Sequence, residues 1–146
     1  MHVFEVRNAE LLESITQQAA EHGITSAAIV ALIGGIDSFT VSTNPADDPT
    51  AHTIASYPLP AEMTATGEIV DGKPHIHAVM AVQGDRAIGG HLHQAHLGTS
   101  FARAYVIPSE HHIEVPAHEQ VVFEQFPDEG APAGWGRIND TRVGPP

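Results

Sequence analysis

The chain has 146 residues, and eighteen acidic and six basic side chains give it a formal charge of −12. This length corresponds to one ordinary domain that buries its own core, and the absence of cysteine excludes disulfides, thiolate metal ligands and a thiol nucleophile. The charge argues against nucleic acid as a partner, because nonspecific DNA affinity comes largely from lysine and arginine side chains at phosphates.

The first residues contain no basic segment followed by an apolar one, and no apolar run in the chain approaches eighteen residues. These features are typical of a protein without a signal peptide or a membrane-spanning helix. We therefore expect a soluble, cytoplasmic protein with no membrane partner.

The N-terminal part of the chain predicts a short strand followed by one helix. Residues 1–6 alternate weakly and include valine and phenylalanine, as strands do. Residues 9–22 carry apolar side chains at helical spacing, with Asn8 as the predicted N-cap and Gly23 as the residue that ends the helix. The apolar stripe of this helix is expected to pack on the core.

The following residues have the composition of β-strands. Residues 25–33 are almost continuously apolar, which is typical of a buried central strand. We interpret Gly34 and Gly35 as a tight turn or sharp bend that separates this strand from the next one. Outside the histidine-rich hairpin described below, further strands are expected at residues 36–43, 51–57, 61–70, 99–107 and 120–126.

The end of the chain differs in composition from the rest. From residue 127 it is rich in glycine and proline and has no periodicity, so we predict a domain over residues 1–126 and a C-terminal tail over residues 127–146. Trp135 is the exception within this tail. A tryptophan in such a context is expected to dock on an apolar surface of its own domain or of a neighbouring subunit.

Residues 74–97 contain five of the eleven histidines and predict a β-hairpin. A three-residue turn at residues 83–85 places all the strand histidines on one face and the apolar side chains on the other, whereas a two-residue turn mixes the two sets. The favoured register pairs His77 with His91 and His75 with His93. The opposite, apolar face is then made of Ile76, Ala78, Met80, Val82, Ile88 and Leu92.

The histidine face has two interpretations. A strand-borne His-x-His pair is often just two solvated residues on the wet side of a sheet. Opposed Cβ atoms in a ladder are about 4.5–5.5 Å apart, however, so three imidazoles of this quartet can converge on one metal ion at about 2.0–2.1 Å per Zn–N bond. We favour the metal site, and the spacing by itself does not select among zinc, nickel, copper and iron.

The order of these motifs resembles the plants-and-prokaryotes-conserved (PPC, also PCC) domain family, free-standing bacterial type, over roughly residues 1–125. The motifs that carry the resemblance are an early helix, a strand with Glu62 and Gly67, the run His75-Ile76-His77, and Gly89-Gly90-His91-Leu92 about a dozen residues later. The resemblance implies an α+β fold with a mostly antiparallel sheet of seven or eight strands and one packed N-terminal helix. It also implies a homotrimer with clefts between subunits, and a divalent metal such as zinc at His75, His77 and His91.

Plant members of that family are chromatin proteins, and bacterial members are often labelled DNA-binding. This chain lacks the Arg-Gly-Arg-Pro motif of an AT-hook and is strongly acidic, which argues against that label. His93, His96 and the tail lie outside the family pattern. A cupin is the structural alternative, but the cupin pattern needs a glutamate shortly after the His-x-His pair, and residues 78–83 contain none.

Two classes of function are open at this point. The first is a metal-dependent enzyme or sensor for a small molecule, in which three histidines hold the ion, one coordination position stays open and Glu62 serves as general base. Hydrolysis, hydration and proton transfer next to a carbonyl all fit. The alternative is a non-enzymatic trimeric regulatory or DNA-associated protein whose histidines are polar interface residues.

The balance of strands and helices also predicts self-association. The single helix covers only part of one sheet face, and the strands at residues 25–33 and 78–82 are apolar on both faces. A neighbouring copy of the chain is the expected cover for the second face. The physical argument predicts a homo-oligomer, and the resemblance specifies a trimer.

Overall fold

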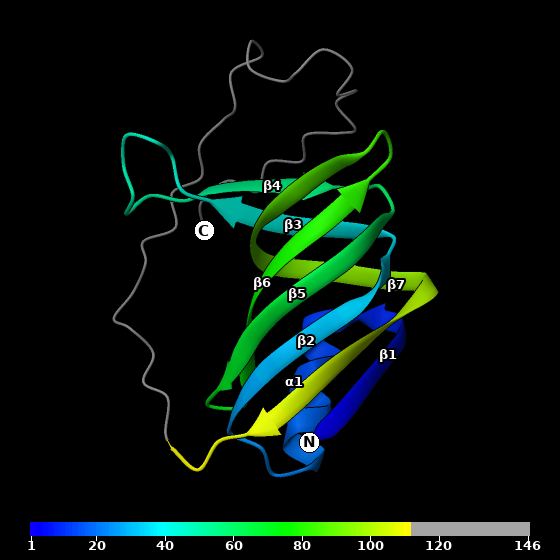
Figure 1. Cartoon of the computed structure of the whole chain (residues 1–146), viewed down its shortest axis with the longest axis vertical. Coiled ribbons are helices and arrows are strands. Elements are labelled where there is room, and N and C mark those ends of the chain that lie inside the picture. Colours follow the sequence, from blue (N-terminus) through cyan, green and yellow to red (C-terminus); the bar gives the residue numbers. More distant parts are fainter. Residues whose placement is uncertain (112–146) are drawn as a thin grey trace.

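The computed structural model describes residues 1–111. Within them the chain forms one helix and seven strands, which belong to a single antiparallel sheet (Figure 1). This confirms the predicted α+β class with a packed N-terminal helix. The elements are β1 (His2–Glu10), α1 (Leu11–Glu21), β2 (Ser26–Ile36), β3 (Ser38–Thr43), β4 (Thr53–Tyr57), β5 (Ala61–Val70), β6 (Lys73–Val82) and β7 (Arg86–Pro108).

The long strand β7 organises the sheet. Its first half pairs with β6 and β3, and its second half pairs with β1 and β2. Because β2 also pairs with β5, and β5 with β6, the strands β2, β5, β6 and β7 form a closed circuit. The sheet is therefore strongly curved and not an open layer, and α1 packs against β1, β6 and β7.

The core follows from the alternation of the strands. The predicted apolar face of the hairpin is buried: Ile76 and Met80 are fully inaccessible, and Leu92 is 1% exposed. Helix α1 contributes three buried side chains at helical spacing, namely Leu11, Ile15 and Ala19. The histidines of the hairpin therefore stand on a rigid layer, since the alternate residues of the same strands are anchored in the core.

The predicted start of the helix was wrong, whereas its predicted end was right. Asn8 is not the N-cap of the helix but lies within β1 with a positive φ of 48°, where β1 shifts its register against β7. The cap is Glu10, whose side chain accepts a hydrogen bond from the Glu13 amide at 2.7 Å. Gly23 does end the helix as predicted, with a φ of 67° that glycine adopts without steric cost.

The interpretation of Gly34-Gly35 as a turn was also wrong, because β2 continues through both residues to Ile36. A β-carbon on Gly34 lies 2.2 Å from the Phe101 carbonyl oxygen, so glycine is required there by the close approach of β7. The bend follows at Asp37, whose carboxylate accepts hydrogen bonds from the Gly98 and Thr99 amides and from the Thr99 hydroxyl at 2.6 Å. The Thr99 hydroxyl is the main reason why the pKa of Asp37 lies below its ordinary value.

The region predicted as a return strand followed by a separate strand at residues 99–107 is the single strand β7. The predicted strand at residues 120–126, the tail over residues 127–146 and Trp135 lie outside the described residues. Over the part of the chain that is described, no helix is long and apolar enough to cross a membrane.

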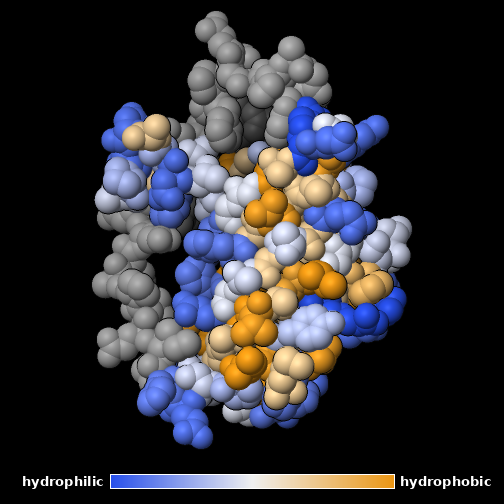
Figure 2. Space-filling model, in the orientation of Figure 1, coloured by the Kyte–Doolittle hydropathy of each residue, from blue (hydrophilic) through white to orange (hydrophobic). Residues whose placement is uncertain are grey.

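The outer face of the sheet is partly apolar. Figure 2 shows apolar residues gathered along the middle of the face on which β2, β5 and β6 lie in Figure 1. Val30, Ile33 and Val79 keep 46–49% of their surface exposed. The register sets Val79 opposite Thr64, and Thr64 opposite Ile33, so this apolar stripe runs across neighbouring strands.

Candidate metal centre

The histidine-rich hairpin consists of β6 and β7 joined by a three-residue turn. His77 pairs with His91, and the pairing continues to the residues next to the turn at 83–85. The register that keeps the histidines on one face is thereby confirmed. Gly84 and Asp85 adopt positive φ angles of 86° and 58° in the turn, which glycine does freely and aspartate tolerates.

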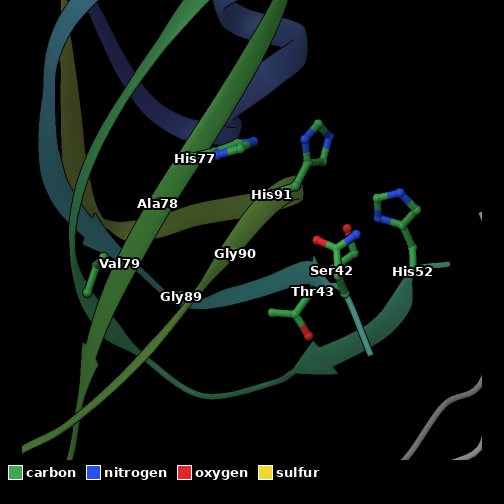
Figure 3. A pocket seen from close by; sticks show the side chains of 10 residues that line it. Ser42, Thr43, His52, His77, Ala78, Val79, Gly89, Gly90 and His91 are labelled. Atoms are coloured by element: carbon green, nitrogen blue, oxygen red, sulfur yellow. The ribbon is translucent and has the colours of Figure 1, made fainter. Parts of the chain in front are cut away.

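The three histidines predicted as ligands lie together. His75, His77 and His91 each offer a ring nitrogen, and these nitrogens lie within 4.8 Å of one another. Figure 3 shows the ring of His77 pointing toward His91. Three nitrogens bound to zinc at tetrahedral angles and 2.0–2.1 Å are about 3.3 Å apart, so side-chain rotations that close the group by at most about 1.5 Å are enough to hold an ion.

His93 belongs to the same cluster but not in the predicted way. The ladder between β6 and β7 ends at the His77–His91 pair, so the expectation that His93 lies opposite His75 was wrong. Thr40 pairs with Gln94 while Val41 pairs with Leu92, which leaves His93 as the extra residue of a β-bulge. Its ring centroid is 4.7 Å from that of His91, and its Nε2 atom lies 2.8 Å from Ser42 Oγ.

A carboxylate stands beside the triad. Glu68 pairs with His75 across β5 and β6, and Glu68 Oε1 lies 3.2 Å from His75 Nδ1. When Nδ1 carries the ring proton, it donates to Glu68 and leaves Nε2 of His75 as the free lone pair for a metal. This is how outer carboxylates usually fix the tautomer of a ligand histidine.

Glu62, the residue predicted as general base, lies further along the same strand. It pairs with Ala81, whereas Thr66 is the residue of β5 that pairs with His77. Four residues of extended strand separate Glu62 from Thr66, a distance of about 13 Å at roughly 3.3 Å per residue. Within one chain the structure brings Glu68 to the histidines and does not bring Glu62.

Glu68 could have been found in the sequence. The turn signal Asp71-Gly72 between two strands sets Val70 opposite Lys73, and counting outward sets Glu68 opposite His75. Ser42 and His93 carry no such signal, because their contact depends on a pairing between β3 and β7 that is distant in sequence and on the position of a bulge.

A cleft adjoins the triad. It has a volume of about 400 Å³ and lies where the β6–β7 hairpin meets β3 and the start of β4. In Figure 3 the side chains of His77 and His91 stand at one end, followed by Ser42 and then His52. None of the described side chains that line it is a lysine, arginine, aspartate or glutamate; they are Ser42, Thr43, Asn44, His52, His77, Ala78, Val79, Gly89, Gly90 and His91.

The two glycines of the motif shape this cleft in different ways. A β-carbon on Gly90 lies 2.3 Å from the Ser42 carbonyl oxygen, so only glycine lets β3 and β7 approach this closely beside His91. A β-carbon on Gly89 meets Ala78 O at 3.3 Å, which is tight but not prohibitive.

Comparison with known proteins agrees with this arrangement. The model of the Plants and Prokaryotes Conserved (PCC) domain matches residues 1–110. The chain belongs to this family. The match covers the helix, all described strands and the four clustered histidines, which confirms the resemblance drawn from the motifs. No curated protein matches the chain with statistical significance.

Several solved structures share the fold of this PCC-domain protein. A candidate DNA-binding protein from Ralstonia eutropha JMP134 is 24% identical over 74% of this chain and 77% of its own, with a TM-score of 0.63. A metal-containing protein from Archaeoglobus fulgidus is 24% identical over 73% and 77%, with a TM-score of 0.61. A plant- and prokaryote-conserved protein from Pyrococcus horikoshii is 18% identical over 86% and 92%, with a TM-score of 0.58. At these identities the likeness establishes the fold.

Proposed function

We propose that this PCC-domain protein is a metal-dependent enzyme or sensor for a small molecule, with a divalent ion held by His75, His77 and His91. The observation that carries the proposal is the convergence of three imidazole nitrogens within 4.8 Å on two paired strands. The metal-containing relative from Archaeoglobus fulgidus supports it. Imidazole nitrogens suit zinc, and three protein ligands are the pattern of zinc sites that keep a fourth position open.

Zinc bound in this way lowers the pKa of a water ligand toward neutrality or polarises a carbonyl group. The chain's own contribution is to fix the imidazoles and to leave a cleft next to them. His77 and His91 line that cleft, so an open coordination position can face a ligand there. The proposed role of Glu62 as general base requires a second copy of the chain to bring its carboxylate to the histidines.

The metal site is tested by zinc content and zinc affinity of purified protein. The wild-type chain is expected to bind one zinc per chain, and the His77→Ala variant to lose most of this affinity. His96→Ala is the matched control, since His96 is an exposed histidine on the same strand β7 outside the triad. Full zinc occupancy in a triple alanine variant of His75, His77 and His91 would refute the proposal.

The orienting role of Glu68 is tested in the same assay. Loss of a carboxylate that holds a ligand histidine typically costs 10–100-fold in metal affinity, and the partial exposure of this pair places the expected loss for Glu68→Gln at about tenfold. Glu62→Gln removes a carboxylate from the same face of β5 without touching the triad, and it should leave zinc affinity unchanged. Equal affinities of the two variants would exclude the role of Glu68.

We further propose that the protein assembles as a homotrimer through the outer face of the sheet. The exposed side chains of Val30, Ile33 and Val79 support this, because an apolar stripe that crosses several strands is stabilised by a covering surface. Sedimentation at micromolar concentration is expected to give three times the chain mass, and Ile33→Glu to dissociate the assembly. A wild-type mass near 15.5 kDa would contradict the proposal.

A further inference from the structure

The cleft beside the triad has a chemical character that restricts its ligand. We infer that it takes a small monocarboxylate with an oxygen on the neighbouring carbon, that is, a short-chain 2-hydroxy or 2-oxo acid. The inference rests on the proposed function, because the ion at the three histidines is taken to bind the carboxylate. It goes beyond that function by naming the ligand class and by assigning Ser42 to its recognition.

The number of negative charges on the ligand follows from the lining. Three neutral histidines leave a divalent ion with its full charge, so one carboxylate at the ion is well compensated. The cleft has no lysine or arginine among its described lining residues to compensate a second anionic group. An additional carboxylate or a phosphate would therefore lie in the cleft without a counter-charge from its described lining, in a chain whose formal charge is already −12.

The second oxygen of the ligand has a partner in Ser42. Ser42 pairs with His91 across β3 and β7, so its side chain lies next to a metal ligand at the wall of the cleft. Its hydroxyl group is only 2.8 Å from His93 Nε2. If Nε2–H donates to Ser42 Oγ, the serine proton is left to donate into the cleft, and in the other tautomer Oγ keeps a lone pair. The pair suits an alcohol or a carbonyl oxygen equally, which is why both acid types belong to the inferred class.

The size and the remaining walls limit the rest of the molecule. Ligand pockets usually measure about 300–1,000 Å³, so a cleft of about 400 Å³ is at the small end of that range. Ala78, Val79 and the backbone of Gly89 form an apolar wall that suits a short aliphatic chain. The cleft therefore favours a ligand of a few carbon atoms over a sugar phosphate or a nucleotide.

The bulge at His93 determines how His91 and His93 of β7 lie around Ser42. Without the extra residue, the register of β7 against β3 would not shift between Thr40 and Val41. The shift sets both His91 and His93 beside Ser42, one by strand pairing and one by hydrogen bond. Bulges commonly redirect a side chain next to a site in this way.

Titration calorimetry on the full chain loaded with zinc tests the inference, with lactate and pyruvate as probes. Both are expected to bind to the zinc form and not to the metal-free form. Propionate, which lacks the second oxygen, and malate, which has a second carboxylate, should each bind about fivefold more weakly than lactate, because propionate forgoes the hydrogen bond to Ser42 and malate brings a charge that the cleft does not compensate.

Ser42→Ala is expected to weaken lactate binding about five- to tenfold while zinc affinity stays unchanged. Ser56→Ala is the matched control, because Ser56 also takes part in a partly buried hydroxyl hydrogen bond of β3 and β4, with Thr40 Oγ1 at 2.9 Å, and does not line the cleft. Equal lactate affinity of the two variants, tighter binding of malate, or no binding of either probe to zinc-loaded protein overturns the inference. Absence of zinc binding would instead sink the proposed function, and the inference with it.

Discussion

The two adjacent glycines of the hairpin provide a sharp test of the site geometry. In Gly90→Ala the new methyl group would lie 2.3 Å from the Ser42 carbonyl oxygen, about 1 Å closer than an ordinary contact, so β3 and β7 must separate beside His91. Overpacking of this kind costs about 1–3 kcal/mol. In Gly89→Ala the nearest atoms are Ala78 O at 3.3 Å and Val79 Cγ2 at 3.6 Å, so little has to move.

The entropy that alanine removes from the unfolded chain stabilises by about 0.4–1 kcal/mol and offsets the tight contact in Gly89→Ala. We therefore expect the free energy of unfolding of Gly89→Ala to lie within about 1 kcal/mol of the wild-type value, and that of Gly90→Ala to lie clearly below the wild-type value. Urea unfolding of the metal-free proteins at one fixed chain concentration measures both, because self-association makes stability concentration-dependent. A Gly90→Ala protein as stable as wild type, or less damaged than Gly89→Ala, would show that β3 does not lie against the motif as described.

Two further predictions concern the layer below the site and the bend at the end of β2. Ile76, which lies between His75 and His77 in the sequence, is fully buried, so Ile76→Ala should lower the free energy of unfolding by about 2–5 kcal/mol in the same urea assay. Val79 is exposed, so Val79→Ala should lower it by far less. Equal losses of stability in the two variants would contradict the assigned faces. The pKa of Asp37 is lowered in the folded state, chiefly by the Thr99 hydroxyl, so its carboxylate stabilises the fold above the unfolded pKa and loses this effect as the pH falls through the folded pKa. Asp37→Asn should thus have a lower melting temperature than wild type at pH 7, and the two melting temperatures should converge as the pH falls below about 4. A difference in melting temperature that persists unchanged into acid would refute this.

The sequence predicts the local parts of this protein well. Alternation along residues 74–97 is enough to set the hairpin register, because a slip by one residue would bury His77 and expose Met80. The pattern of residues 61–70 likewise predicts a strand there, with the bounds that β5 has in the structure. The membership in the PCC family likewise follows from motifs that lie on these few strands.

The nonlocal parts were not accessible in the same way. Gly34 and Gly35 have the composition of a turn, and only the close passage of β7 explains why a strand runs through them. Asn8 is a better intrinsic cap than Glu10, but the pairing of β1 with β7 extends past Asn8 and delays the helix start. The contact between Ser42 and His93 spans 51 residues and depends on a bulge that no local pattern marks.

The last prediction concerns DNA, since two of the similar solved structures are candidate DNA-binding proteins. Arg7 and Arg103 lie on neighbouring strands, but the Glu5 carboxylate accepts a hydrogen bond from the Nε atom of each, with N–O distances of 2.7 and 2.8 Å. The carboxylate thus cancels one of the two charges at the point where the described basic side chains come closest to a cluster. Lys73 and Arg86, the other described basic residues, begin the strands β6 and β7, at opposite ends of the paired hairpin.

A protein that binds duplex DNA nonspecifically at physiological salt usually does so at about 10⁻⁴–10⁻⁶ M, through several phosphate contacts whose counterion release makes the affinity fall steeply with salt. With one uncompensated positive charge at the arginine pair and −12 on the whole chain, we expect an affinity weaker than this range. Fluorescence anisotropy with a labelled A·T-rich duplex between 50 and 200 mM salt measures it, on zinc-loaded and metal-free protein. Micromolar binding that weakens by tenfold or more across that range would refute this expectation. If Arg7 and Arg103 then contact phosphates, Glu5→Gln, which removes the carboxylate that pairs with both, should strengthen the binding.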